Sequence, residues 1–313
     1  MATRTLDLLP TSMLHSSTMV SKVTPRTLSI LLGTVAGASM VIAVGSRKFS
    51  TSARLDSPAA PRKIFSGGLA LCSLPLEESD MVSHDTKRLR FKLPESSAVS
   101  GLPLTSALLT FSWPAGHWFP VIRPYTPISR SDTPGIVELL IKRYPQGKAS
   151  THIHSLSPGQ SLFFLATLKG PQWKANAVPH VLLIAGGAGI TPCYQLAQGI
   201  LENRNDQTAV TLVYGANSDR DVLLKAEMTA WEERFPGRFK AVHAVSHPEE
   251  GSKYEKGYVT GDLLKRALPN GKQHETRVFV CGPPAMEKSL VGDRSSRGIL
   301  QEVGFSKDQI NTF

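Results

Sequence analysis

A seven-residue segment in the first half of the chain, Arg123–Ser129, reads RPYTPIS and combines a guanidinium, a phenol ring and two hydroxyls. An arginine side chain is a forked cation that suits a pyrophosphate. A tyrosine ring offers a flat face to a ring system, and a threonine hydroxyl can hydrogen-bond near its reactive nitrogen. The segment therefore indicates a flavin dinucleotide site; taken alone, a surface strand followed by a proline turn is the alternative.

A second anion-binding feature follows at Gly147–Thr151, with the sequence GKAST. We predict a short helix over residues 151–156, with Ser150 or Thr151 as its N-cap. The free amides of a helix N-terminus, preceded by a small residue, favour a phosphate. Two such features on one small domain fit a dinucleotide better than either fits another ligand.

A glycine-rich turn, Gly186–Pro192 with the sequence GGAGITP, follows the apolar run 181–185. The run is typical of a buried parallel strand. Thr191 is a plausible N-cap of the next helix, and Pro192 suits its first position. Glycines at this place allow the backbone to approach a phosphate or a nicotinamide closely. The pattern is not GxGxxG, so an ordinary tight strand-to-helix connection is the alternative.

A comparable turn, Cys281–Met286 with the sequence CGPPAM, ends the predicted strand 277–280. In a parallel sheet both turns lie at the carboxyl ends of strands, where ligands bind. Cys281 is either a small buried apolar residue or part of the site, and its place beside glycine and proline favours the site. No nearby base or helix N-terminus is expected to convert it to a thiolate, so we do not expect a covalent nucleophile.

The elements that position these motifs fall into two groups. Strands are predicted at 88–93, 108–111, 136–144 and 161–165, and no helix of ten residues fits between 84 and 147. Short strands at this spacing predict an antiparallel β-barrel over residues 77–174. Beyond it, strands at 181–185, 210–214, 239–245 and 277–280 alternate with helices, among them helices predicted at 221–235 and at 262–267, the second capped by Thr260. This alternation predicts an α/β domain with a parallel sheet over 175–313. The fold class is thus α+β with two domains.

The N-terminal part of the chain has the features of a targeting sequence and a membrane anchor. Residues 28–45 carry no charge, and as a helix they would span about 27 Å, enough for a hydrocarbon core. The preceding stretch is rich in Ser and Thr and poor in acids, and RKFSTS at 47–52 resembles a presequence cleavage region. We therefore predict a mitochondrial leader with one transmembrane helix over 1–55 and a linker over 56–76; a secretory signal peptide is the alternative.

Charge and cysteine content exclude other classes of function. The net charge is +10, but residues 1–65 contribute +6 of it, so the remainder is only mildly basic. No aromatic-basic pattern accompanies the charge, so we expect no nucleic-acid partner. The three cysteines have no paired spacing, and we predict neither a metal site nor a disulfide.

With these motifs in order, the chain resembles the ferredoxin-reductase-type flavoproteins, and within them the mitochondrial NADH-cytochrome b5 reductases of fungi. The likeness runs from His84 to Phe313 and includes HDTKRLRFKLP, RPYTPIS, IKRYPQGKAST, LLIAGGAGITP and VFVCGPPAM. It implies FAD as cofactor, NADH as hydride donor, with NADPH possible, and a cytochrome b5-like haem protein as acceptor of single electrons. It also implies a monomer attached to a mitochondrial membrane, the outer membrane or its intermembrane-space side.

The resemblance assigns roles to residues of this sequence. The implied FAD contacts are Arg123, Pro124, Tyr125, Thr126, Ser129, Gly147, Lys148, Ala149 and Ser150. Lys142 and Tyr144 match positions beside the two cofactors. The implied nicotinamide-nucleotide contacts are Gly187, Gly189, Thr191, Pro192, Ser246, Cys281, Gly282, Pro283, Met286 and Phe313. Thr126 and Cys281 are the implied catalytic residues, and no general base is assigned.

Three positions depart from the family pattern. Relatives commonly carry Met where Ala149 stands, Thr where Ala188 stands, and Asp where Ser246 stands. The first two changes remove side-chain contacts but keep the backbone amides, and the third removes a carboxylate that repels a 2′-phosphate. A quinone or small-molecule acceptor, or a nucleotide-binding membrane protein without redox turnover, are the alternatives to the implied activity.

Overall fold

The computed structural model describes residues 60–114, 116, 118–268 and 271–313, which belong to one compact unit, Ser57–Phe313. Within these residues no helix is both long and apolar enough to cross a bilayer. The predicted leader and transmembrane helix at 1–55 lie outside the described residues.

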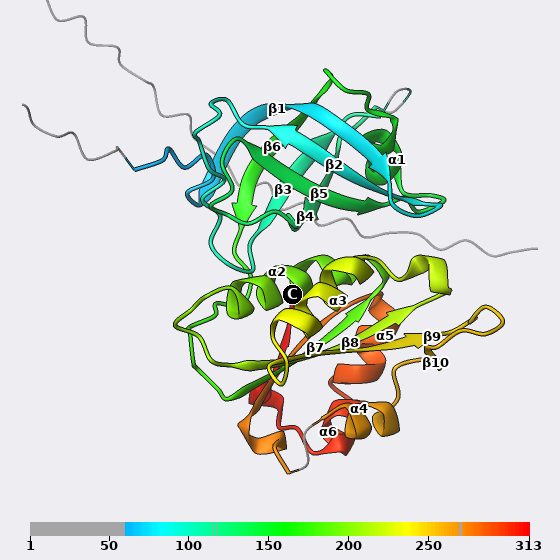
Figure 1. Cartoon of the computed structure of the whole chain (residues 1–313). Helices are drawn as coiled ribbons and strands as arrows, with labels where there is room; N and C mark the ends of the chain where they lie inside the picture. The colour runs from blue at the N-terminus through cyan, green and yellow to red at the C-terminus, as the bar shows by residue number, and fades with distance from the viewer. Residues whose placement is uncertain (1–59, 115, 117, 269–270) are drawn as a thin grey trace, which may run out of the picture. The chain divides into compact units, whose positions relative to one another are not determined.

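The first half of the unit is a six-stranded antiparallel sheet with the strand order β4-β3-β6-β1-β2-β5 (Figure 1). Its strands are β1 (Gly68–Met81), β2 (Thr86–Lys92), β3 (Ala107–Ser112), β4 (Val121–Tyr125), β5 (Ile136–Lys142) and β6 (Ser161–Leu168). The inner face forms a core in which Leu89, Phe91 and Phe164 are fully buried. The strand predicted at 88–93 is confirmed as β2, on which buried apolar residues alternate with basic ones.

The predicted barrel is an open half-barrel. The strands β4 and β5 end the sheet, and only a single bridge, Pro127 with Leu139, connects the chain after β4 to β5 among the described residues. Among the described residues the first helix is α1 (Lys148–Ser155), which follows β5, so the described part of 84–147 contains no helix of ten residues, as expected.

The linker predicted over 56–76 is wrong in its second half. Strand β1 begins at Gly68 and pairs with both β6 and β2, and Phe65 before it is fully buried. The segment from Gly68 to Leu76 has no polar-apolar alternation, so the sequence pattern did not predict a strand there.

The second half is a six-stranded parallel sheet with the order β10-β9-β8-β7-β11-β12. Its strands are β7 (His180–Gly186), β8 (Ala209–Ala216), β9 (Phe239–Val245), β10 (Glu255–Lys256), β11 (Thr276–Cys281) and β12 (Ile310–Thr312). The four longer strands lie at the positions that the sequence predicted, and β12 was not predicted.

Helices cover both faces of this sheet (Figure 1). They are α2 (Ile190–Leu201), α3 (Lys225–Arg234), α4 (Gly261–Ala267), α5 (Pro284–Val291) and α6 (Ile299–Val303). Helices α2 and α3 share one core with Leu183 and Tyr214, whereas α4, α5 and α6 share another with Leu182 and Ile184. Successive residues of β7 therefore point into different cores, as expected for a strand buried on both faces.

Three predicted helix starts are shifted and one is confirmed. Helix α1 begins at Lys148 with Gly147 as N-cap, and α2 begins at Ile190 with Gly189 as N-cap, so neither Ser150, Thr151 nor Thr191 caps a helix. The helix predicted from Asp221 begins at Lys225, because Asp221 belongs to a capping box with Ser218. Thr260 caps α4 as predicted, and its hydroxyl accepts from the Leu263 amide.

Candidate functional site

Strand β4 presents Arg123 and Tyr125 on one face. Their Cα partners on β3 are Thr110 and Leu108, both fully buried in the inner face of the half-barrel. The Arg123 guanidinium is exposed and donates to the carbonyl of Ile122, so it remains open to an added anion. Burial raises the pKa of Tyr125 to about 12, with a smaller lowering contribution from Arg123, so this phenol stays neutral.

The turn before α1 has the form of an anion cradle. A Cβ at Gly147 would lie 2.3 Å from the Ser150 hydroxyl oxygen, so this position accepts only glycine without rearrangement. The Ser150 hydroxyl donates to the Gly147 carbonyl at 3.0 Å, which holds the turn closed. Gly147 and Lys148 line a surface pocket together with Pro114 of the β3–β4 connection. The leading amides of α1, with no acidic residue in its first turn, suit a phosphate there.

The two turns at the carboxyl ends of β7 and β11 lie against one another. A Cβ at Gly189 would lie 2.2 Å from the carbonyl oxygen of Cys281, and one at Gly186 would lie 2.4 Å from the sulfur of Met286. Gly187 has a φ of +52° with nothing within 4 Å of a would-be Cβ, so it combines a left-handed backbone with open space. Bare backbone is thus presented at a strand end, where a planar ligand group can approach it.

Tyr144 connects the half-barrel to these turns. The phenol lies beside the backbone of Ala188 and near Cys281, and burial raises its pKa. It also lies within electrostatic reach of Tyr125. The predicted residues of β4, the segment after β5, and the two glycine-rich turns are therefore brought to one continuous site.

Lys142, at the end of β5, forms an ion triad with Asp85 and Asp221. Its ammonium lies 2.7 Å from an Asp85 oxygen and 2.6 Å from an Asp221 oxygen, and its side chain is only 11 % exposed. Burial lowers the pKa of Lys142, but hydrogen bonds and attraction from both carboxylates outweigh burial and raise it overall. Burial is the largest single influence on the pKa values of Asp85 and Asp221 and raises them. The hydrogen bonds from Lys142 and from neighbouring hydroxyls, together with the Lys142 charge, outweigh burial, so both pKa values are lowered overall.

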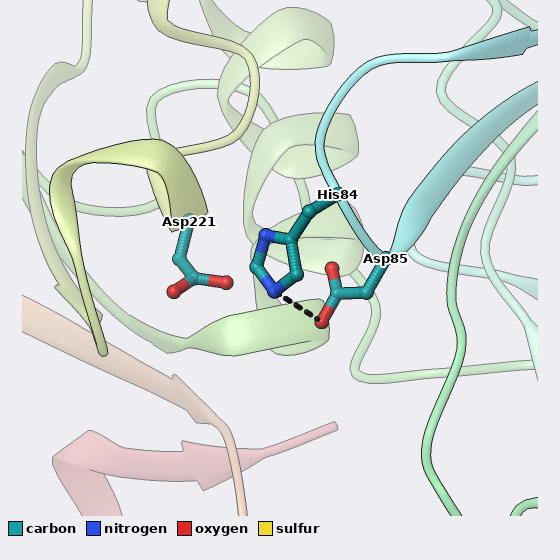
Figure 2. Close-up of side chains that lie close together, drawn as sticks. All are labelled: His84, Asp85 and Asp221. Atoms are coloured by element: carbon teal, nitrogen blue, oxygen red, sulfur yellow. Dashed lines mark ion pairs between the residues drawn. The ribbon is translucent and has the colours of Figure 1, made fainter.

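His84 approaches the same carboxylates, as Figure 2 shows. Its ring lies 3.5 Å from Asp85, and potential ligand atoms of His84, Asp85 and Asp221 lie within 4.8 Å of one another. Three such groups resemble a metal site in composition. Because the Lys142 ammonium already contacts both carboxylates, we assign the cluster as an ion triad that joins the half-barrel to the α/β half.

Cys281 is a protonated thiol. Burial raises its pKa to about 12, and the nearby Glu287 raises it further. A neutral thiol beside the backbone of Gly189 can pack and hydrogen-bond, but it is not the thiolate that a nucleophile requires. This agrees with the expectation that Cys281 does not act covalently.

The remaining predicted residues lie at the margins of the site. Ser246 directly follows β9 and is half-buried; its amide donates to Ala216, the last residue of β8. Phe313 ends the chain beside β11, where its amide donates to Val280 and its ring packs on Phe279. Ser129 accepts from the Glu138 amide, so its hydroxyl has a structural partner in β5.

Sequence reasoning missed two residues of the site, Asp85 and Asp221. Asp85 stands in the HDT motif that contributed to the resemblance, and that motif was the available signal. Nothing in the sequence links Asp85 to Asp221, because only the fold brings β2 and the turn after β8 together.

Comparison with known proteins agrees with this geometry. Residues 73–176 match the family described as oxidoreductase FAD-binding domain, and residues 183–291 match the oxidoreductase NAD-binding domain. Among solved structures, the cytochrome b5 reductase domain of Ulva prolifera nitrate reductase is 28 % identical with a TM-score of 0.68, covering 81 % of this chain and 100 % of that one. The fold and site thus define a two-domain, FAD- and NAD-binding oxidoreductase of the ferredoxin-reductase type.

Sequence relatives narrow the class to one family. NADH-cytochrome b5 reductase 2 of Emericella nidulans is 43 % identical over 308 residues, which is 96 % of each chain. The protein of the same name from Pyricularia oryzae is 47 % identical over 262 residues, covering 82 % of this chain and 79 % of that one. The chain belongs to the NADH-cytochrome b5 reductase family.

Proposed function

We propose that this protein oxidises NADH through bound FAD and passes single electrons to cytochrome b5 or a similar haem protein. The observation that carries the proposal is the continuous arrangement of Arg123, Tyr125, Tyr144, Gly187 and Cys281 across the two halves of the fold. When bound, FAD supplies the chemistry, by accepting a hydride and releasing electrons one at a time.

Side chains of the half-barrel bind and orient the flavin in this proposal. Arg123 and the amides at the start of α1 neutralise the pyrophosphate, and Tyr125 supports the ring system. Thr126 follows Tyr125 directly and is half-buried, and in this proposal its hydroxyl hydrogen-bonds the ring. Gly187 has open space where a side chain would stand, which leaves room for a cofactor. The FAD-binding domain in this proposal is residues 77–174.

The turns of the α/β domain hold the nicotinamide nucleotide. Gly187 and Gly189 offer backbone, Thr191 and Pro192 shape the start of α2, and Cys281 closes the opposite side. The Lys142 triad connects the two halves of the fold, and in this proposal it helps to hold the hydride donor against the acceptor. In this proposal Ser246, which directly follows β9, faces the adenosine ribose.

Steady-state kinetics with purified acceptors test the proposal. We expect NADH-dependent reduction of cytochrome b5 with a kcat/KM well above that for a quinone, and inhibition as ionic strength rises, because the encounter of a basic reductase with an acidic haem protein is screened by salt. A higher kcat/KM for the quinone than for cytochrome b5 would contradict the proposed acceptor and favour the quinone.

We further propose that the protein is a monomer held in a mitochondrial membrane by its N-terminal segment. The support is the uncharged stretch 28–45 and the basic, acid-poor sequence around it. Deleting residues 1–55 removes none of the site residues, so we expect a soluble protein that keeps NADH-dependent reduction of a dye. Pelleting of the deleted form with membranes after an alkaline carbonate wash would contradict the anchor.

A further inference from the structure

The outer face of the half-barrel is apolar across four neighbouring strands. One row of Cα partners runs from Ser73 on β1 through Phe163 and Phe111 to Ile122 on β4. The Phe111 ring lies 6.1 Å from Phe163 and 6.0 Å from Trp113, so the aromatic side chains form one surface cluster.

The neighbouring row on the same face is apolar as well. It joins Leu69 on β1 to Ala166, Leu109 and Pro124. Leu69 is 79 % exposed and Leu71 is 60 % exposed. Arg123 and Tyr125 alternate with these outward residues along β4, so the apolar face lies on the opposite side of the strand from the proposed flavin contacts.

Charge is missing from the outer face of this half of the sheet, where Arg123 on β4 points to the other side, but not from the other half. The strands β3 and β6, and β1 from Gly68 to Leu76, contain no Asp, Glu, Lys or Arg. On β2 and β5, by contrast, Arg90 forms ion pairs with Glu78 and Glu138. An antiparallel sheet normally turns a polar face to water, and a large contiguous apolar patch marks an interaction site.

The connection from β3 to β4, which follows the outward-facing Phe111, carries two further exposed aromatic residues. Trp118 is 90 % exposed and Phe119 is 81 % exposed. Tryptophan is enriched where a bilayer meets water, because its ring is apolar and its N–H is polar. The aromatic composition of this edge therefore fits a lipid surface better than it fits bulk water.

Strand β1 follows the proposed anchor closely in the sequence. Strand β1, which carries Leu69 and Leu71, begins at Gly68, and only residues 46–67 separate it from the uncharged stretch 28–45. These residues span at most about 75 Å when fully extended, so the half-barrel of an anchored chain stays close to the bilayer.

We infer that the outer face formed by β1, β6, β3 and β4, together with Trp118 and Phe119, docks on the surface of a lipid bilayer. This docking rests in part on the proposed anchor and adds to it a fixed orientation of the catalytic unit, with the Arg123 side of β4 turned away from the lipid.

Tryptophan quenching by lipid provides the test. The full chain is reconstituted in phosphatidylcholine vesicles with or without brominated acyl chains. Trp231 is buried and Trp173 is partly buried, so bilayer contact is reported by Trp113 and Trp118. We expect brominated lipid to lower the emission by about a third or more, since these are two of the four tryptophans. In Trp113→Phe/Trp118→Phe, which stays apolar, the quenching should disappear.

A second pair of variants separates docking from mere proximity. Leu69→Asn/Leu71→Asn keeps all tryptophans and should reduce the quenching at least about twofold, because the polar amides oppose entry into the interface. The matched control is Tyr258→Asn, which changes an exposed aromatic residue in the α/β half and should leave the quenching unchanged. Circular dichroism and flavin content confirm that each variant is folded.

Three outcomes decide the inference. Absence of quenching in the wild type overturns it, whether or not carbonate extracts the protein. A dimer in detergent that Leu69→Asn/Leu71→Asn dissociates, with no quenching in vesicles, also overturns it and assigns the face to self-association. If brominated lipid quenches the emission but a carbonate wash then removes the protein from the vesicles, the docking is supported and only the proposed anchor is contradicted.

Discussion

Removing the Lys142 ammonium should destabilise the protein more than any surface ion pair would. In Lys142→Met the carboxylates of Asp85 and Asp221 remain, with potential ligand atoms within 4.8 Å of each other. At an effective dielectric constant of about 20, two like charges at this distance repel by about 3 kcal/mol. Removing one partner of a buried ion pair typically lowers the free energy of unfolding by about 3–5 kcal/mol, and we expect a decrease of this size in Lys142→Met.

Chemical denaturation of the Ser57–Phe313 fragment at pH 7.5, followed by circular dichroism, measures the effect. Lys92→Met is the matched control, because the Lys92 side chain is 61 % exposed in its ion pair with Glu77. This substitution should lower the free energy of unfolding by less than about 1 kcal/mol. Adding Asp85→Asn and Asp221→Asn to Lys142→Met should restore most of the stability, since no unpaired charge is left.

The pH dependence of the same variant gives an independent check. In the wild type, the lowered carboxyl pKa values contribute stability above about pH 4 that is lost as the pH falls through them. In Lys142→Met, acid should narrow the gap to the wild type, because protonating one carboxyl relieves the repulsion. A cost below about 1 kcal/mol at pH 7.5, or a gap that does not change with pH, would refute the reasoning.

Four further predictions concern single residues. Arg123→Ala should weaken FAD binding by about 2–4 kcal/mol, measured by flavin content after gel filtration, and an unchanged content would remove Arg123 from the pyrophosphate site. Cys281→Ser should slow flavin bleaching by NADH about tenfold in stopped flow, without loss of FAD, and complete inactivation or a trapped cysteine adduct would contradict the non-covalent role. Ser246→Asp should raise the NADH/NADPH ratio of kcat/KM roughly 5- to 30-fold, and an unchanged ratio would mean that residue 246 does not face the ribose. Burial lowers the pKa of His180 to about 4, so the unfolded state takes up its proton first as the pH falls below about 6.5. The wild type should therefore lose about 2 kcal/mol more stability than His180→Gln between pH 7.5 and 5, and equal losses would argue that His180 is protonated in the fold.

Strands with a clear period or a continuous apolar run could be predicted from the sequence. Strand β9 lies at Phe239–Val245 as predicted, and Leu89 and Phe91 on β2 are fully buried. Strand β1 was not predicted, because its first half shows neither polar-apolar alternation nor an unbroken apolar run, since Ser73 and Pro75 interrupt it. The uncharged, largely apolar sequence of the first half of β1, which did not predict a strand, also gives its outer side the composition of a docking surface.

Motif residues were predicted better than the contacts between them. The glycine-rich turns could be placed at strand ends, yet the closeness of Gly189 to Cys281 depends on β7 and β11 being neighbours in the sheet. The triad of Lys142 likewise depends on side chains from both halves of the fold. Helix starts were misplaced because Ser150 and Thr191 were expected as caps, whereas glycines occupy both N-cap positions.

The central claim is that the two halves of the fold hold FAD and NADH in contact. Its most direct test is the visible spectrum of the purified Ser57–Phe313 fragment during anaerobic addition of NADH. We expect a yellow protein whose flavin absorbance is bleached by NADH and restored by oxidised cytochrome b5. A well-folded but colourless fragment, or a yellow one that NADH leaves oxidised, would contradict the account.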